Sequence, residues 1–128
     1  MEKPMLSCLI VDDSPTVRKL IRRIISDWKF DIEEAGDGRE ALDTCIRKMP
    51  DLIFLDWNMP VMNGIDFLEH LRGVQNGEKP TVVFCTTENG FDFIQRGIKA
   101  GANEYIMKPF DKSIIEAKLE TLGILASA

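Results

Sequence analysis

Acidic side chains follow two short apolar runs of the chain. Asp12 and Asp13 come after LSCLIV, and Asp56 comes after LIFL. Since the carboxyl ends of parallel strands meet at one edge of a sheet, we expect the three carboxylates to cluster there. Charges of one sign a few ångströms apart repel by about 4 kcal/mol per pair at an effective dielectric of about 20, and a bound cation would offset this. A shallow site of oxygen ligands is typical of Mg²⁺.

Two other apolar runs also end in polar residues. Thr86 and Thr87 follow TVVFC, and Lys108 follows EYIM and precedes Pro109. A lysine neutralises an anion that enters a carboxylate–metal site, while the Thr86 hydroxyl and the Thr87 backbone N–H can donate hydrogen bonds to it. Together these groups indicate phosphoryl transfer to a carboxylate nucleophile. Taken singly, each residue also fits a structural role, as a cap, a turn residue, a surface lysine or a strand threonine.

Five apolar runs predict the strands that would position these residues. The runs are Leu6–Val11, Phe30–Ala35, Leu52–Leu55, Thr81–Cys85 and Glu104–Met107. The third and fourth are nearly continuous, which is typical of central strands covered on both faces. Asp31 and Glu33 favour an edge position for the second. The alternation of strands with helices predicts an α/β fold, a three-layer α/β/α sandwich around a five-stranded parallel sheet.

Amphipathic stretches between the runs predict five helices. The first begins after Ser14, with proline at its first position. The others begin after Asp37-Gly38 and at about Ile65, Phe91 and Lys112, and the last ends near Leu122. The apolar stripe of the fourth helix is expected to lie mostly in the core; it comprises Phe91, Ile94 and Ile98. We expect a single domain over residues 1–128, with its core at about residues 6–122.

Composition narrows the classes of function. The chain has 128 residues, with 16 basic and 21 acidic side chains and a net charge of −5. This balance argues against general affinity for nucleic acids or anionic membranes. Three cysteines without a CxxC pair, Cys8, Cys45 and Cys85, are expected to be buried free thiols. With neither a secretory signal nor a long apolar stretch in view, we expect a cytoplasmic protein without membrane insertion.

Four segments resemble a known family. LIVDDSPTVRKLIRRII, LIFLDWNMPVMNGIDFL, VVFCTTENG and GANEYIMKPF are similar, in that order, to the response-regulator receiver domain of bacterial two-component signalling. Among receivers the chain most resembles single-domain CheY-like chemotaxis regulators. The resemblance implies a flavodoxin-like sheet of order 2-1-3-4-5. It also implies a monomeric signalling domain, not an enzyme, which a histidine kinase phosphorylates and which then changes its binding to a protein target such as the flagellar motor.

The resemblance assigns roles to the acidic cluster. Asp56 matches the phosphoacceptor, which takes the phosphoryl group from a phosphohistidine of the kinase. The Mg²⁺ site would comprise Asp13 as a direct ligand, Asp12 acting through water, Asp56, and the backbone carbonyl of Asn58. Lys108 matches the lysine that pairs with the phosphoryl group, and its bond to proline is usually cis in this family.

The resemblance also assigns a switch and a means of reversal. Thr86 matches the switch hydroxyl, and Tyr105 matches the aromatic residue whose ring moves inward with it. Asn58 and Glu88 match the pair that sets the rate of autodephosphorylation, and their identities imply a rapid rate. Thr87 is bulkier than the residue usual beside the switch, so its methyl group would narrow access to the phosphoryl group.

Three other functions stay open. The chain would equally suit a phosphate sink or relay intermediate with no motor target. An aspartate-nucleophile phosphatase would want a second acid at position 58, which is Asn58, and usually a cap domain. A flavodoxin-like FMN carrier would need a phosphate loop where Asp12 and Asp13 stand. His70, the one histidine, is expected to be a solvated helix residue, so the protein receives phosphoryl groups and does not supply them.

Overall fold

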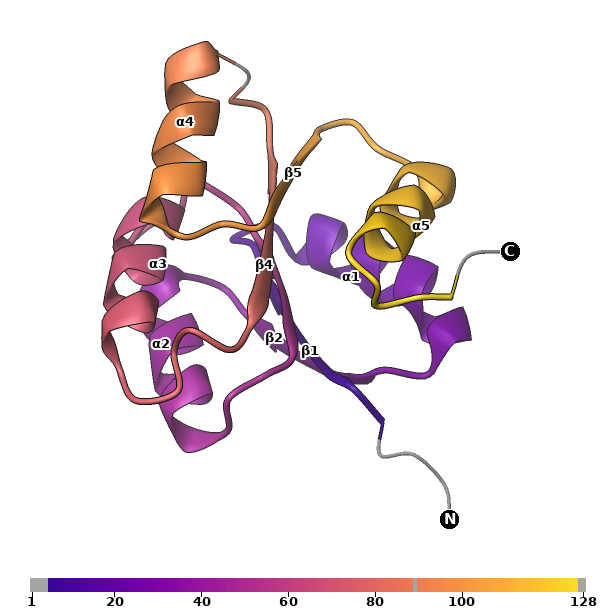
Figure 1. Ribbon diagram of the computed structural model, residues 1–128, viewed down its shortest axis with the longest axis horizontal. Coiled ribbons are helices and arrows are strands. Elements are labelled where there is room, and N and C mark those ends of the chain that lie inside the picture. The colour runs from indigo at the N-terminus through magenta and orange to yellow at the C-terminus, as the bar shows by residue number, and fades with distance from the viewer. Residues whose placement is uncertain (1–4, 89, 127–128) are drawn as a thin grey trace.

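The computed structural model describes residues 5–88 and 90–126, and its strands form one parallel sheet (Figure 1). The strands are β1 (Ser7–Val11), β2 (Asp31–Ala35), β3 (Leu52–Leu55), β4 (Thr81–Thr86) and β5 (Glu104–Met107). Their order is β2-β1-β3-β4-β5, as the resemblance implied. β2 lies on one side of β1 and β3 on the other. The strand order therefore reverses between β1 and β3, and α/β folds commonly bind ligands at such a point.

Five helices cover the two faces of this sheet. They are α1 (Pro15–Ile25), α2 (Gly38–Arg47), α3 (Gly64–Gly73), α4 (Phe91–Ala100) and α5 (Lys112–Thr121). Helices α1 and α5 lie on one face, and α2, α3 and α4 lie on the other (Figure 1). This arrangement confirms the three-layer sandwich. None of the helices within the described ranges is both long and apolar enough to cross a membrane.

The sheet separates two hydrophobic cores. Leu9, Val11 and Phe84 belong to the cluster shared with α2 and α3. Ile10 and Phe54 belong to the cluster shared with α1 and α5. Because successive strand residues point to opposite faces, a strand between two cores must be apolar throughout. This explains the nearly continuous apolar runs of β3 and β4.

Local signals at the element ends act as expected. Ser14 caps α1 by accepting a hydrogen bond from the N–H of Val17. Asp37 caps α2 in the same way through Glu40. β2 is an edge strand, as its acidic residues indicated. The predicted element bounds differ from those observed by up to two residues, since helix and strand ends depend on hydrogen bonds that patterns of side chains do not specify. The three cysteines are buried and free.

The expectation that the α4 stripe lies in the core is wrong. Phe91 is 72% exposed and Ile98 is 48% exposed. Of the ten residues of α4, all described, Gly97 alone is buried. A Cβ atom there would lie 3.1 Å from the Phe84 ring, so the helix packs its backbone closely against that ring. The inward face of α4 is thus narrow, and helical spacing of apolar residues did not identify it.

Candidate functional site

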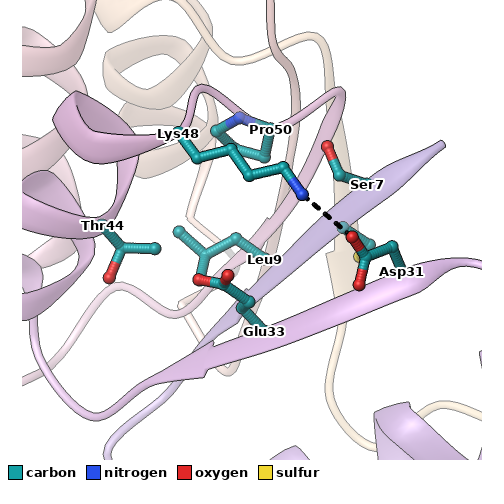
Figure 2. A pocket seen from close by; sticks show the side chains of 8 residues that line it. Ser7, Leu9, Asp31, Glu33, Thr44, Lys48 and Pro50 are labelled. Carbon is teal, nitrogen blue, oxygen red and sulfur yellow. Dashed lines mark hydrogen bonds and ion pairs between the residues drawn. The ribbon is translucent and has the colours of Figure 1, made fainter.

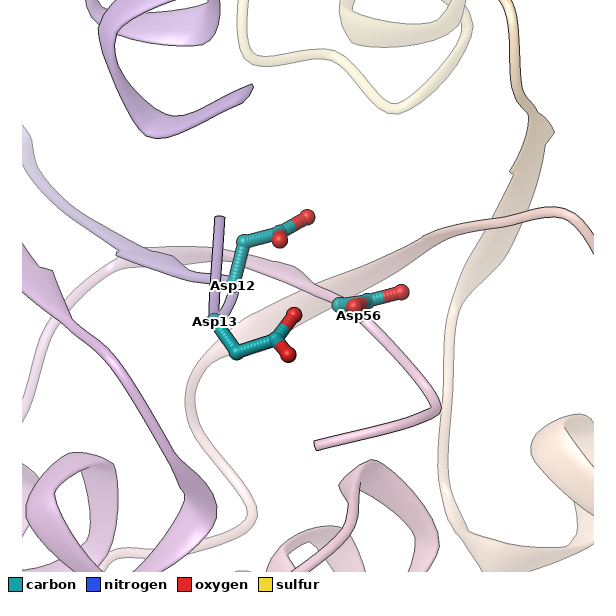
Figure 3. A group of neighbouring side chains, drawn as sticks. All are labelled: Asp12, Asp13 and Asp56. Carbon is teal, nitrogen blue, oxygen red and sulfur yellow. The ribbon is translucent and has the colours of Figure 1, made fainter. Parts of the chain in front are cut away.

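The three predicted carboxylates meet at the carboxyl ends of β1 and β3. The register pairs Val11 with Leu55, so Asp12 and Asp56 leave neighbouring strands side by side. The Asp56 N–H also donates to the Val11 carbonyl at 2.8 Å. Carboxylate oxygens of Asp12, Asp13 and Asp56 all lie within 4.8 Å of one another (Figure 3). Asp12 and Asp56 are buried, whereas Asp13 is exposed, so the cluster is open to solvent on one side.

Lys108 brings a positive charge into this cluster from the end of β5. Its Nζ lies 2.9 Å from Asp12 Oδ2 and 3.3 Å from Asp56 Oδ1. Asp56 Oδ1 also accepts a hydrogen bond from the Trp57 backbone N–H at 2.9 Å. The Lys108–Pro109 peptide bond is cis. One ammonium group faces three carboxylates, so the cluster keeps an excess of negative charge.

The pKa values of the buried groups reflect these contacts. Burial and the neighbouring Asp12 raise the pKa of Asp56 to about 6, although Lys108 and the Trp57 N–H oppose the rise. Burial lowers the pKa of Lys108, but its bonds to Asp12 and Asp56 more than offset this and leave it above its ordinary value. The balance of these contacts thus leaves the pKa of Asp56 well above that of an exposed aspartate.

The donor chemistry of this cluster fits a hard cation. All three side chains offer carboxylate oxygens, and the cluster carries uncompensated negative charge. Oxygen ligands of this kind favour Mg²⁺ or Ca²⁺ over softer metals, and a site with few protein ligands leaves room for the waters that Mg²⁺ retains. Asp12, Asp13 and Asp56 could therefore hold a divalent metal ion.

A hydrogen-bond network joins the hydroxyl groups on the other side of the site. Thr86 ends β4, is fully buried, and accepts a hydrogen bond at Oγ1 from the Glu88 N–H at 3.2 Å. The Tyr105 hydroxyl donates to the Glu88 carbonyl at 2.7 Å. Burial and Glu88 raise the pKa of Tyr105 to about 12, so the hydroxyl keeps its proton. Both backbone groups of Glu88 thus connect the two residues that the sequence assigned to a switch.

Asn58 and Glu88 also bind each other through their side chains. Asn58 Nδ2 donates to Glu88 Oε1 at 2.8 Å, which links the loop after β3 to the loop after β4. Thr87 is exposed beside them. It lines a mostly apolar groove with Lys108, Pro109 and Val17. Every predicted site residue except Tyr105, which lies inside β5, is therefore at the carboxyl end of a strand or in the loop that follows it.

A small cavity at the opposite end of β1 is not a ligand site. Ser7, Leu9 and Asp31 line it, and Lys48 pairs with Asp31 across it at 3.0 Å (Figure 2). Its volume is about 10 Å³. That is room for one water molecule at most.

The sequence did not identify two residues that hydrogen-bond to the acids. One uses its own backbone N–H, and the other bonds to a backbone carbonyl of the acids. Trp57 is buried against the rings of Phe84 and Phe93, while its backbone N–H donates a hydrogen bond to Asp56 Oδ1. Arg18 donates from Nη1 to the Asp12 carbonyl at 2.6 Å. No pattern distinguishes Arg18 from the other basic residues of α1, because its role depends on which way one side chain turns.

Comparison with known proteins identifies the family. The response regulator receiver domain matches residues 8–120. The chain belongs to this receiver family. Chemotaxis protein CheY1 of Helicobacter pylori is 34% identical over 119 residues, which cover 91% of this chain and 96% of that protein. Chemotaxis protein CheY of Pseudomonas aeruginosa is 36% identical over 118 residues, which cover 91% and 95%.

Solved structures of receivers agree with this assignment. The structure of the Vibrio cholerae chemotaxis protein CheY4 matches with a TM-score of 0.86 at 32% identity, and the match covers 92% of this chain and 98% of that one. The chain is thus a CheY-like receiver of two-component signalling. Membership of this family implies a histidine kinase as phosphodonor and a protein as target.

Proposed function

We propose that this receiver accepts a phosphoryl group on Asp56 from the phosphohistidine of a histidine kinase. One observation carries the proposal: the buried Asp56 carboxylate lies 3.3 Å from the Lys108 ammonium, within a cluster of two further carboxylates. A nucleophile, a fixed positive charge and a set of oxygen ligands are the parts that phosphoryl transfer requires.

The transfer is a displacement at phosphorus. An Asp56 carboxylate oxygen forms a bond to the phosphorus while the bond from phosphorus to the histidine nitrogen breaks, and the imidazole leaves with that electron pair. Lys108 offsets the charge on the transferred group, and the Thr86 hydroxyl and the Thr87 N–H donate to its oxygens. Asp12, Asp13, Asp56 and the Asn58 carbonyl would hold Mg²⁺, which, when bound, supplies further charge stabilisation to the phosphoryl oxygens.

The hydrogen bonds of Glu88 suggest how the modification is transmitted. When the Thr86 hydroxyl turns to the phosphoryl group, it leaves the Glu88 N–H to which it is now bonded. The Glu88 carbonyl holds the Tyr105 hydroxyl, so a shift of this loop frees the Tyr105 ring to move inward. This movement would alter the surface that includes α4, where Phe91 and Ile98 are exposed.

The signal ends when water attacks the acyl phosphate and restores the Asp56 carboxylate. Asn58 and Glu88 set this rate, and their mutual hydrogen bond holds the two side chains together in the loops beside the site. Thr87 narrows the approach to the same phosphorus. We further propose that this chain is a cytoplasmic chemotaxis regulator whose target is the flagellar motor switch. The names of several relatives, which are chemotaxis proteins, support the chemotaxis role.

Tryptophan fluorescence tests the phosphoacceptor assignment. In a Trp28→Phe background Trp57 is the remaining tryptophan of the two in the chain, and it adjoins Asp56. We expect its emission to change with Mg²⁺ and again with beryllofluoride, a mimic of the acyl phosphate. Asp56→Asn should abolish the second response, whereas Asp43→Asn, at an exposed acid of α2, should leave both intact.

Labelling with a small phosphodonor gives an independent measurement. Lys108→Ala should leave Asp56 open to modification but uncouple it from the switch, so that beryllofluoride no longer shifts the Tyr105 resonances. Retained Mg²⁺-dependent labelling of the Asp56→Asn protein would contradict the assignment of the phosphoacceptor.

A further inference from the structure

Two arginines of α1 share one acceptor on the edge strand. Arg18 Nε donates to Glu34 Oε1 at 3.0 Å, and Arg22 Nε donates to Glu34 Oε2 at 2.6 Å. They are one helical turn apart, and their bonds tie α1 to β2. Their side chains differ in depth, since that of Arg18 is 19% exposed and that of Arg22 is 45% exposed.

Arg18 alone of the pair extends to the acidic cluster. Its Nη1 donates a hydrogen bond to the Asp12 carbonyl at 2.6 Å, while its Nε donates to Glu34. The guanidinium therefore bridges Glu34 and the Asp12 carbonyl. The Asp12 N–H donates to the Ala35 carbonyl at 3.1 Å, and Asp12 Oδ1 accepts from the Ser14 N–H at 2.9 Å. Asp12 is thus hydrogen-bonded to β2, to α1 and to the turn that joins β1 to α1.

The Asp12 carbonyl belongs to the peptide unit that joins Asp12 to Asp13. Rotation of this unit would move the exposed Asp13 carboxylate relative to the buried Asp12 and Asp56 carboxylates. Groups that fix the orientation of metal ligands contribute to affinity, because the ligands then need no rearrangement when the ion arrives.

We infer that Arg18 is a positioning residue, whose hydrogen bond to the Asp12 carbonyl orients the Asp12–Asp13 peptide so that the three carboxylates converge on a cation. This inference rests on the proposed Mg²⁺ site. Arg22, which shares Glu34 but stands apart from Asp12, holds α1 to β2 without this role.

The charge of Arg18 and its positioning role affect cation binding with opposite signs. Removing a positive charge near a cation site strengthens cation binding by Coulomb's law. Removing the hydrogen bond to Asp12 should weaken it. The direction of the change therefore distinguishes the two contributions, and Arg22→Met measures what the loss of a charge and of a bond to Glu34 does alone.

The test is a Mg²⁺ titration followed by Trp57 fluorescence in the Trp28→Phe background. Arg18→Met should raise the dissociation constant about tenfold, as for other residues that orient metal ligands. Arg22→Met should leave it unchanged or lower it by no more than about twofold. Without Mg²⁺, the amide of Ser14 should exchange with solvent faster in Arg18→Met than in Arg22→Met.

A conservative variant keeps the test decisive if Arg18→Met does not fold. Arg18→Lys retains the charge, but one ammonium group lacks the two separate N–H edges that bond Glu34 and Asp12, so binding should again be weaker. Equal dissociation constants for the Arg18 and Arg22 variants, or tighter binding by Arg18→Met, would overturn the positioning role alone. A wild-type protein that does not respond to Mg²⁺ would contradict the proposed site, and this inference with it.

Discussion

The two sides of the site are anchored very differently. On the acidic side, α1 buries Ile21, Ile24 and Ile25 and is capped by Ser14. On the hydroxyl side, α4 buries only Gly97 among its ten residues and begins after Gly90, which offers no side-chain cap. Since local stability follows buried apolar contact, the acids adjoin a firmly packed helix and the switch residues adjoin a weakly packed one. This division suits a domain that must bind at one place and move at another.

The two sides also differ in charge. Asp12 and Asp56 are buried close together with one lysine between them, whereas Thr86 and Tyr105 are joined through the backbone of Glu88 without buried charge. Buried charges of one sign destabilise the folded state unless they are offset. The firm packing of α1 therefore supports an unfavourable cluster, while the hydroxyl side needs no such support.

Truncating one isoleucine on each helix should give the largest contrast. Ile25→Ala removes a fully buried side chain of α1 and should lower the free energy of unfolding by about 3 kcal/mol. Ile98→Ala on α4 should lower it by less than about 0.5 kcal/mol, since that side chain is half exposed. Urea denaturation measures both. Similar losses would show that α4 is as firmly packed as α1.

Neutralising Asp56 should stabilise the metal-free protein. The pKa of Asp56 is raised from 3.8 to about 6, so folding is penalised above pH 6 and the penalty disappears below about pH 4. In EDTA at about pH 7.5, Asp56→Asn should therefore raise the free energy of unfolding by roughly 2–3 kcal/mol. Thermal unfolding across this pH range measures the gain.

A control variant on the hydroxyl side completes that experiment. Glu88→Gln keeps the acceptor for Asn58 and should change stability by less than about 0.5 kcal/mol at either pH. An Asp56→Asn gain that persists undiminished at about pH 4 would mean that the charge of Asp56 is not its source.

The helix caps offer a smaller version of the comparison. Ser14→Ala removes the side-chain acceptor of the Val17 N–H and should lower the free energy of unfolding by about 1 kcal/mol. Gly90→Ser supplies a side-chain cap that α4 lacks and should raise the free energy of unfolding by about 0.3 kcal/mol. If Gly90→Ser destabilises the protein, the start of α4 is constrained by something other than its missing cap.

Sequence patterns predicted the acidic side of the site better than the side that adjoins α4. The runs of β1 and β3 placed Asp12 and Asp56 correctly, because a strand between two cores must be apolar and its end is then visible. The stripe of Phe91 and Ile98 misled, because burial of α4 depends on the close approach of Gly97 to a ring on β4. Hydrogen bonds from Arg18 and Trp57 depend on rotamers and backbone direction, for which residue type gives no signal.

A further small effect concerns the aromatic contacts of α4. The Arg96 guanidinium lies 5.5 Å from the Trp57 ring centre, and Phe93 packs edge-on to the same ring at 5.2 Å. Arg96→Ala should lower the free energy of unfolding by only about 0.5 kcal/mol, the value of a partly exposed cation–π contact. It should nevertheless change Trp57 emission in the Trp28→Phe background, while Lys99→Ala on the same helix should not.

A Mg²⁺ titration of Arg96→Ala tests whether the packing of α4 affects metal binding by the acids. The ring of Trp57 faces α4, but its backbone N–H donates a hydrogen bond to Asp56 Oδ1. The Gly64 N–H donates to the Trp57 carbonyl at 2.8 Å, so this backbone is held independently of α4. Arg96→Ala should therefore alter the emission without altering the dissociation constant for Mg²⁺. If the constant shifts as much as in Arg18→Met, α4 holds the acids as firmly as α1 does, and the division between the two sides fails.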